Sequence, residues 1–170
     1  MIEAILGDMC YPKSKALIIP ANTKGIMTKG IPARIIKDGL SSISKEAKLI
    51  TSNNKIEVGG YFTTGPGRLN KRGLKKIYHA VIKVLQSDFT SIYIVRNTLD
   101  NIMQKIIEDS QESLAICGLG IEAGNLDQTT IAKITVEICE RYEDKIKIKI
   151  IDDNVEFIEE AKKHIKRIME

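Results

Sequence analysis

Strand-like and helix-like segments alternate along this chain, and that alternation is the feature that most constrains its fold. Short, uniformly apolar runs such as 16–20 have the character of strands that are covered on both faces. Between them lie segments in which apolar residues recur every three or four positions, which is the period of a helix. Strands that alternate with helices predict a three-layer α/β/α fold with a central mixed, mostly parallel sheet.

The individual elements can be located from the same patterns. We expect strands over 2–6, 16–20, 58–64, 74–81, 113–117 and 146–150. We expect two short helices after Pro32, separated near Gly39, and longer helices over 90–109, 127–142 and 155–168. Pro32 suits the first turn of a helix, and Thr90 or Asp88 is a candidate cap for the helix over 90–109. In the last strand isoleucines alternate with Lys145, Lys147 and Lys149, and lysines on such a strand commonly discourage edge-to-edge pairing.

The length of 170 residues is that of one domain, so we expect a single domain over residues 1–170. A charged fraction of 28% with both signs mixed excludes a disordered chain. The longest apolar runs are far shorter than the ~20 residues that a membrane helix needs. Glu3, Asp8 and Pro12 interrupt any signal-peptide pattern at the start. We therefore expect a soluble, cytoplasmic protein with no membrane partner.

The cysteines are odd in number and widely spaced, at Cys10, Cys117 and Cys139. They lack the C-x-x-C pairing of zinc and redox sites, so we expect buried, reduced thiols. We expect neither a metal site nor a cofactor. The sequence does not define an oligomeric state.

Three loops that follow strands are candidates for chemistry, because α/β sheets bind ligands at the carboxyl ends of their strands. They are Gly7-Asp8-Met9, the segment 21–32 and the segment 117–127. The last contains Gly118, Gly120 and Gly124, a spacing one residue longer than the usual dinucleotide fingerprint. A dinucleotide-binding oxidoreductase domain that uses this loop is therefore one alternative for the function.

A second alternative rests on a run of cations: Arg68, Lys71, Arg72, Lys75 and Lys76. No acid interrupts the run, so it suggests a basic module that binds RNA or poly(ADP-ribose) without catalysis. However, the net charge is only +4, and aromatic residues, which stack on bases, are 5% of the chain with no Trp. We therefore expect a solvated surface and no nucleic-acid partner.

Taken in order, four stretches of the chain resemble the macro domain, a family that binds ADP-ribose and includes proteins that process ADP-ribose-1''-phosphate. The stretches are 7–9, 16–25, 63–69 with 77–81, and 113–126. The resemblance runs from the first strand to the last helix. It implies the same three-layer fold, ADP-ribose or ADP-ribosylated molecules as partners, and a binding site built from the loops named above.

The resemblance also implies roles for particular residues. Asp8 would accept a hydrogen bond from the adenine amino group, and Met9 would offer its backbone N–H to the same ring. Asn22 would hold the distal ribose, and it is also the candidate catalytic residue. Ile151 falls where many members stack an aromatic ring on the adenine. The two loops facing the diphosphate would be formed by Gly30 and Ile31, and by Gly120, Ile121, Glu122, Ala123 and Gly124.

Several positions depart from the family pattern. Thr28 and Lys29 occupy part of a run that is often all glycine, and Pro32 stands where hydrolytic members often carry an Asp. Glu122 replaces a small residue and would place a carboxylate beside the diphosphate, unless Lys24 or Lys29 offsets its charge. The sequence thus predicts binding of ADP-ribose or a related metabolite. Slow hydrolysis of ADP-ribosyl groups or of ADP-ribose-1''-phosphate is the enzymatic alternative.

Overall fold

The central element of the structure is a six-stranded sheet with the strand order β1-β6-β5-β2-β4-β3. The structure is a computed structural model that describes residues 1–87 and 89–170, and the side chain of Ala123 is not described either. All neighbouring strands are parallel except β3 and β4, which are antiparallel. The strands are β1 Ile2–Leu6, β2 Ala16–Asn22, β3 Tyr61–Thr64, β4 Lys76–Lys83, β5 Ser113–Ile116 and β6 Lys147–Asp152.

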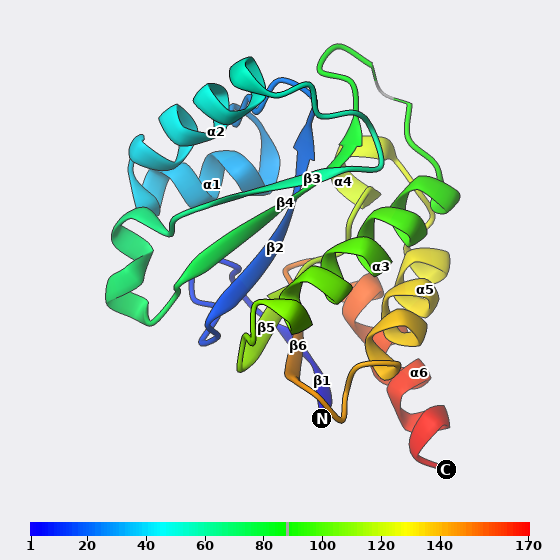
Figure 1. Ribbon diagram of the computed structural model, residues 1–170. Coiled ribbons are helices and arrows are strands. Elements are labelled where there is room, and N and C mark those ends of the chain that lie inside the picture. The colour runs from blue at the N-terminus through cyan, green and yellow to red at the C-terminus, as the bar shows by residue number, and fades with distance from the viewer. Residues whose placement is uncertain (88) are drawn as a thin grey trace.

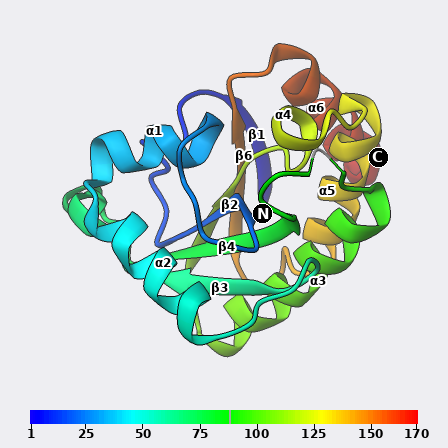
Figure 2. The same cartoon turned by 90° about the horizontal axis from the view of Figure 1, so that it is seen from above.

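Helices cover both faces of this sheet, as Figures 1 and 2 show. One layer contains α1 Gly30–Gly39 and α2 Ser42–Asn53. The other contains α3 Ile92–Glu108, α5 Gln128–Glu140 and α6 Val155–Met169. Two short helices, α4 Ile121–Gly124 and the 3-10 helix η1 Gly67–Arg72, lie in connections. The three-layer, mostly parallel fold expected from the sequence is therefore confirmed.

The strands at the centre of the sheet carry the core. Ala16, Leu17, Ile18 and Ile19 of β2 are fully buried, as expected of a strand between two helical layers. All three cysteines are buried and free, which confirms that interpretation of their spacing. Burial is the main reason that the pKa of Cys139 is raised to about 12. Within the described residues, no helix combines the length and the apolar character that crossing a membrane requires.

Most of the element bounds differ from the sequence prediction by only a few residues. The predicted cap of the helix over 90–109 needs correcting: α3 is capped by Ser91, whose side chain accepts from the N–H of Ile94 at 3.2 Å. Thr90 does not cap it, and Asp88 lies outside the described residues. Tyr61 begins β3, so residues 58–60 precede the strand, and 58 and 59 form a turn.

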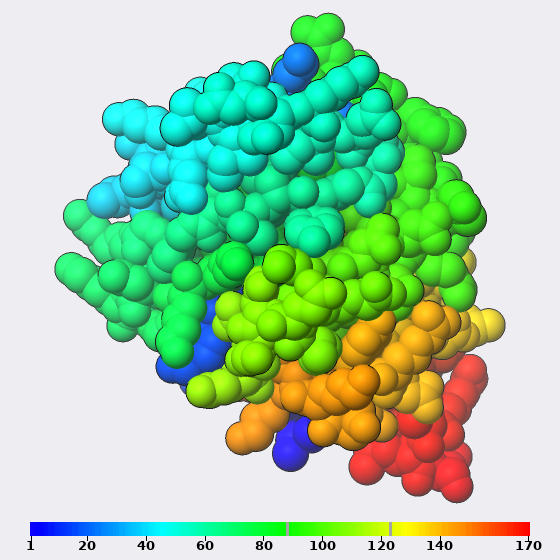
Figure 3. Space-filling model, viewed as in Figure 1, coloured from blue at the N-terminus to red at the C-terminus, as the bar shows by residue number. Residues whose placement is uncertain are grey.

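One inference from the lysine pattern is wrong. The strand β6 does not lie at a sheet edge but between β1 and β5, so protection of an edge does not explain Lys147 and Lys149. Local alternation reports which face of a strand is buried, whereas the order of strands depends on crossovers. The amino ends of β2, β4, β5 and β6 share one edge of the sheet with η1. That edge is at the lower left of Figure 3.

Candidate functional site

A cavity of about 600 Å³ opens at the carboxyl ends of β2 and β4, beside the loop that follows β5. This is the edge at which open α/β sheets bind ligands, and the volume lies within the roughly 300–1,000 Å³ of small-molecule sites. Its lining combines three segments far apart in the sequence: Pro20, Ala21, Asn22, Ile26, Thr28, Lys29, Gly30, Ile31 and Pro32; Lys83, Leu85 and Gln86; and Gly118, Gly120 and Glu122.

The first wall of the cavity is the start of α1. Gly30 begins the helix with φ of +60°, a backbone conformation that side chains disfavour. Lys29, at the N-cap, makes no side-chain capping bond, and Pro32 has no N–H. The first N–H groups of a helix have no acceptor inside it, so those of Gly30 and Ile31 are available to a ligand. The positive end of the dipole of α1 lies at the same place, and it favours an anion.

The second wall is the glycine-rich loop that leads into α4. Gly120 caps α4 with φ of +85°, and a Cβ there would lie 2.7 Å from Leu126 Cδ1. A Cβ at Gly118 would lie 2.6 Å from Ile121 Cδ1. A Cβ at Gly124 would collide with Thr90, so this glycine is required by packing. The packing therefore leaves no room for side chains at these three glycines, and two of them, Gly118 and Gly120, line the cavity.

The buried carboxylate of Asp152 fixes this loop against the end of β6. Asp152 Oδ2 accepts from the N–H of Gly118 at 2.9 Å, and Oδ1 accepts from the N–H of Asn154 at the same distance. Burial raises the pKa of Asp152, and the two backbone hydrogen bonds partly oppose that rise. Sequence reasoning missed this residue because its partner, Gly118, belongs to a distant strand end. The N–H of Gly118 is thereby occupied, so it is not a donor for a ligand.

Asn22 lies at the end of β2 and is buried. Its Oδ1 accepts from the N–H groups of Lys24 at 3.1 Å and Ile26 at 3.2 Å. Its Nδ2 donates to the carbonyl of Ile26 at 2.9 Å. A side-chain amide has two donors, so one N–H of Asn22 is left for a ligand in the cavity. Asn22 therefore holds the loop that follows β2, and its predicted role toward the distal ribose stays a prediction.

The predicted adenine-binding residues come together at a different place. Asp8 and Met9 follow β1, and Ile151 lies on the neighbouring strand β6, which continues to Asp152. None of the three lines the cavity. Met9 and Ile151 are buried, whereas Asp8 is exposed and its Oδ1 accepts from the N–H of Cys10 at 2.8 Å. Within the described residues, the other carboxylate oxygen, Asp8 Oδ2, accepts no hydrogen bond from the protein.

The remaining predicted residues divide between the two places. Gly30, Ile31, Gly120 and Glu122 line the cavity with Asn22. Ile121 and Gly124 belong to α4 but do not line it. The backbone of Ala123 also belongs to α4, and its side chain lies outside the described part of the chain. Of the two cations expected to offset Glu122, Lys29 lines the cavity and Lys24 does not.

Glu122 reaches across from α4 to the start of α1. Its Oε2 lies 3.1 Å from the position that a Cβ on Gly30 would occupy, so its carboxylate lies between the two walls. Arg34 NH2 lies 3.8 Å from Glu122 Oε2, and Arg34 NH1 donates to Asp153 Oδ2 at 2.7 Å. The hydrogen bond from Arg34 lowers the pKa of Asp153. Arg34 thus links α1 to α4 through Glu122, and to the residue that follows β6 through Asp153.

Lys83 is a cavity residue that sequence reasoning missed. The predicted strand ended at Val81, but β4 continues to Lys83, and its neighbours Leu85 and Gln86 also line the cavity. The carbonyl of Lys83 accepts from the N–H of Thr23 at 3.1 Å, which brings the ends of β2 and β4 together. The sequence signal that could have identified Lys83 is a cation just beyond the predicted strand 74–81.

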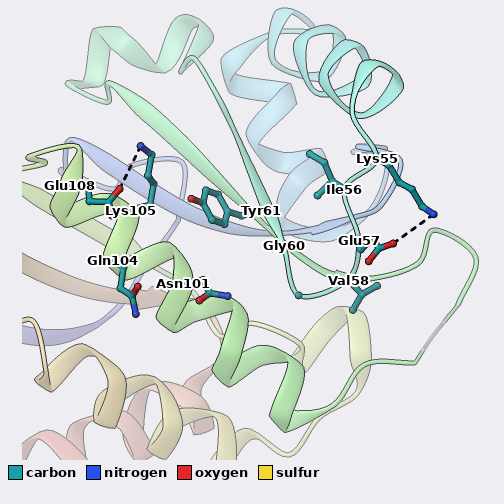
Figure 4. A pocket seen from close by; sticks show the side chains of 11 residues that line it. Lys55, Ile56, Glu57, Val58, Gly60, Tyr61, Asn101, Gln104, Lys105 and Glu108 are labelled. Carbon is teal, nitrogen blue, oxygen red and sulfur yellow. Dashed lines mark ion pairs between the residues drawn. The ribbon is translucent and has the colours of Figure 1, made fainter.

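A second hollow, of about 710 Å³, lies between the segment 55–61 and α3 (Figure 4). Its charged side chains are already paired across short distances: Lys55 with Glu57 at 3.6 Å and Lys105 with Glu108 at 3.8 Å. Its lining residues come from the segment before β3 and from the second half of α3, and they include neither the first turn of a helix nor the carboxyl end of a parallel strand. We therefore assign the functional site to the smaller cavity.

Comparison with known proteins agrees with the fold. The family model described as the Macro domain matches residues 18–135. The macrodomain of Mycobacterium tuberculosis DarG is 21% identical with a TM-score of 0.80, covering 91% of this chain and 99% of that one. An Oceanobacillus iheyensis macrodomain with ADP is 12% identical with a TM-score of 0.85, covering 99% and 91%. Thermosipho africanus DarTG, in complex with ADP-ribose, is 18% identical with a TM-score of 0.75, covering 88% and 41%.

The fold and the cavity define an α/β protein with a ligand site at the carboxyl edge of a mostly parallel sheet. The family model covers more than half of the chain, and the chain belongs to the macro domain family. The resemblance noted in the sequence is confirmed. The loop around Gly118 leads into a helix of only four residues, not into the long helix of a dinucleotide-binding unit.

Proposed function

We propose that this protein binds ADP-ribose in the cavity at the carboxyl edge of the sheet. The observation that carries the proposal is that the starts of α1 and α4 line one and the same cavity. A diphosphate between them would accept hydrogen bonds from the backbone N–H groups of Gly30 and Ile31, and of Gly120, Ile121 and Glu122. Backbone donors bind phosphate without supplying a side-chain charge.

The two ends of the nucleotide then occupy the two places described above. The distal ribose would lie in the cavity, where one N–H of Asn22 remains available to a hydroxyl. The adenosine would extend toward Asp8, Met9 and Ile151 at the ends of β1 and β6. Asp8 Oδ2 would accept from the adenine amino group while Oδ1 keeps its hydrogen bond to Cys10 N–H. The ADP and ADP-ribose present in two similar structures support this choice of ligand.

Titration calorimetry with ADP-ribose, ADP and AMP tests the proposal. Asp8→Asn keeps an oxygen for the hydrogen bond from Cys10 N–H but places an amide where adenine donates. We expect it to weaken ADP-ribose binding at least tenfold, since an unpaired donor pair costs about 1–3 kcal/mol. Asp144→Asn, which removes the same charge from an exposed turn, is the control and should bind normally. Absence of heat at millimolar ligand, or wild-type affinity in Asp8→Asn, overturns the proposal.

A second function, slow hydrolysis of ADP-ribosyl groups or of ADP-ribose-1''-phosphate, is supported by the charged groups around Asn22. Lys29, Lys83 and Glu122 line the same cavity, whereas Pro32 offers no acid or base. A positioned acid or base contributes about 10²–10⁴-fold, so turnover should be slow and should depend on these side chains. Lys83→Met and Asn22→Ala should reduce the release of free ADP-ribose from a modified protein. If both retain the wild-type rate, the cavity is not a hydrolytic site.

We further propose that residues 1–170 act as one domain and that the protein works in the cytoplasm. The six strands from β1 to β6 form one sheet, and the buried residues form one continuous core, which supports a single domain. One cooperative unfolding transition seen by both circular dichroism and tyrosine fluorescence would agree with this. Cell fractionation tests the location.

A further inference from the structure

The lysines of β6 lack an explanation once that strand is known to be internal. Lys147 begins β6, and it is exposed at the amino edge of the sheet, opposite the cavity. Lys15 directly precedes β2, and Lys75 directly precedes β4. In the strand order, β6, β5, β2 and β4 are consecutive. The chain therefore places a cation at the start of three of four adjacent strands.

Hydrogen bonds and register hold these positions in one row. The N–H of Lys75 donates to the carbonyl of Lys15 at 2.8 Å, and the N–H of Lys15 donates to Ser113 Oγ at 2.9 Å. Ser113 in turn is paired with Lys147 in the register of β5 and β6. Neighbouring strands lie about 4.8 Å apart, so the row spans roughly 14 Å.

Further cations flank the row. Lys149 Nζ donates to the carbonyl of Lys13 at 3.4 Å, which brings the loop before β2 against β6. Arg68 and Lys71 are exposed on η1, next to the start of β4. These segments form neighbouring surface at the lower left of Figure 3. We call this the amino-edge surface, and its cations are Lys13, Lys15, Arg68, Lys71, Lys75, Lys147 and Lys149.

The amino-edge surface carries an excess of positive charge. Among the described residues, none of its cations forms an ion pair within 4 Å, whereas Arg72 and Lys76 of the same run are paired with Asp38 and Asp109. Two acids lie at the starts of neighbouring strands: Glu3 of β1, which is the register partner of Lys149, and Glu112, directly before β5. Since the whole chain carries a net charge of only +4, this edge holds an excess that the rest of the molecule lacks.

We propose that the amino-edge surface binds the phosphate backbone of duplex nucleic acid, without sequence preference. Ammonium and guanidinium groups in a row neutralise phosphates and release counterions, which is the main source of non-specific affinity. The scarcity of aromatic residues argues against stacking on single-stranded bases, but it does not bear on contacts with a duplex backbone. Insertion into a membrane needs an amphipathic apolar face. This edge is instead built from strand ends and a 3-10 helix.

Fluorescence anisotropy with a labelled duplex DNA of random sequence tests this proposal across a salt series. If about four phosphates are neutralised, affinity should fall by about a hundredfold between 50 and 200 mM salt. Lys75→Glu/Lys147→Glu should weaken binding at least tenfold at low salt and should flatten the salt dependence. Both side chains are exposed, so we expect the fold to be retained.

The control is Lys24→Glu/Lys55→Glu, which changes the net charge equally at the opposite, carboxyl edge of the sheet. Lys24 follows the end of β2, and Lys55 lies in the segment whose Gly59 N–H donates to Val81 near the end of β4. It should bind DNA within about twofold of the wild type. The proposal is overturned if the two double variants weaken binding equally, if the wild type shows no salt-dependent binding, or if anionic phosphatidylserine vesicles are bound and the duplex is not. None of these outcomes depends on ADP-ribose.

Discussion

At the scale of single residues, Glu122 is the side chain that most limits the proposed ligand. Its carboxylate lies beside Gly30, between the two sets of backbone donors that would hold a diphosphate. Arg34 lies 3.8 Å away but already donates to Asp153, so its charge is shared. A diphosphate must therefore bind next to a carboxylate or displace it.

Neutralising this carboxylate should strengthen binding. Two like charges about 4 Å apart repel by about 1 kcal/mol in a water-like environment, so Glu122→Gln should raise ADP-ribose affinity about fivefold at low salt. Calorimetry measures the change. Adenosine, which has no phosphate, should bind Glu122→Gln and the wild type alike. Glu140→Gln removes an equal charge at the end of α5 and should change neither ligand's affinity. Equal gains for both ligands would contradict a charge effect at the phosphates.

His79 makes a second residue-scale prediction, concerning stability. The ring is buried on β4, stacks on Phe62 with centroids 4.4 Å apart, and its Nε2 lies 2.8 Å from Thr64 Oγ1. Burial lowers the pKa of His79 to about 3 from its ordinary value of 6.5. Below about pH 6.5 the imidazole of His79 therefore binds a proton in the unfolded chain, whereas in the native state it stays neutral until about pH 3. The free energy of unfolding should fall with acidity in this window, by up to about 1.4 kcal/mol per pH unit.

Urea denaturation between pH 7.5 and 4.5 checks this dependence. His79→Phe cannot titrate, so its stability should fall less steeply, although Thr64 loses a partner at a cost of about 1 kcal/mol. Phe62→Leu removes the stacked ring but retains the imidazole, so it should be less stable at every pH and keep the slope. If His79→Phe is as acid-sensitive as the wild type, other groups are responsible.

At the scale of elements, the loop before α4 shows how much depends on the absence of side chains. Gly120 and Gly59 both have positive φ, of +85° and +97°. A Cβ on Gly120 would lie 2.7 Å from Leu126 Cδ1, while a Cβ on Gly59 would meet nothing within 4 Å. Substitutions at these two glycines therefore distinguish the cost of backbone strain from the cost of steric crowding.

Replacing each by alanine should give different losses of stability. Gly59→Ala should cost about 1–2 kcal/mol from the left-handed backbone alone. Gly120→Ala adds overpacking against Leu126, typically 1–3 kcal/mol, and should also weaken ADP-ribose binding because it displaces the start of α4. Chemical denaturation measures both changes. Equal losses in the two variants would show that the loop around Gly120 relaxes without strain.

Elements also mark how far the sequence could predict this structure. Periodicity located every strand and long helix, because burial on one or two faces is a local signal. It could not place β6 inside the sheet, since strand order depends on which crossovers are made. The cavity loops could be predicted as strand ends, whereas Arg34 could not be connected with its partner Asp153, which lies 119 residues away in the chain. Pairing between distant segments leaves no trace in a local pattern.

At the scale of the whole molecule, the two edges of the sheet differ in how their charges are arranged. The carboxyl edge mixes both signs, with Lys29, Lys83 and Glu122 lining its cavity, whereas the cations of the amino edge form no ion pair within the described part of the chain. β2 connects the two edges directly, from Lys15 before its first residue to Asn22 at its end. At about 3.3 Å per residue, its seven residues separate the edges by roughly 20 Å. The interior between them is fully buried and close-packed.

This separation predicts that the two proposed ligands bind independently. The charge of a bound ADP-ribose would lie about 20 Å from the amino-edge surface, beyond the roughly 8 Å Debye length of physiological salt. Coupling would otherwise need an element with two arrangements that both ligands bias, whereas β2 is bonded on both sides, to β4 and β5, and is fully buried over Ala16–Ile19. The affinity for duplex DNA should therefore change less than about twofold between zero and saturating ADP-ribose. Anisotropy titrations with and without the nucleotide measure this directly. A larger change would mean that the DNA reaches the carboxyl edge or that the sheet transmits a rearrangement.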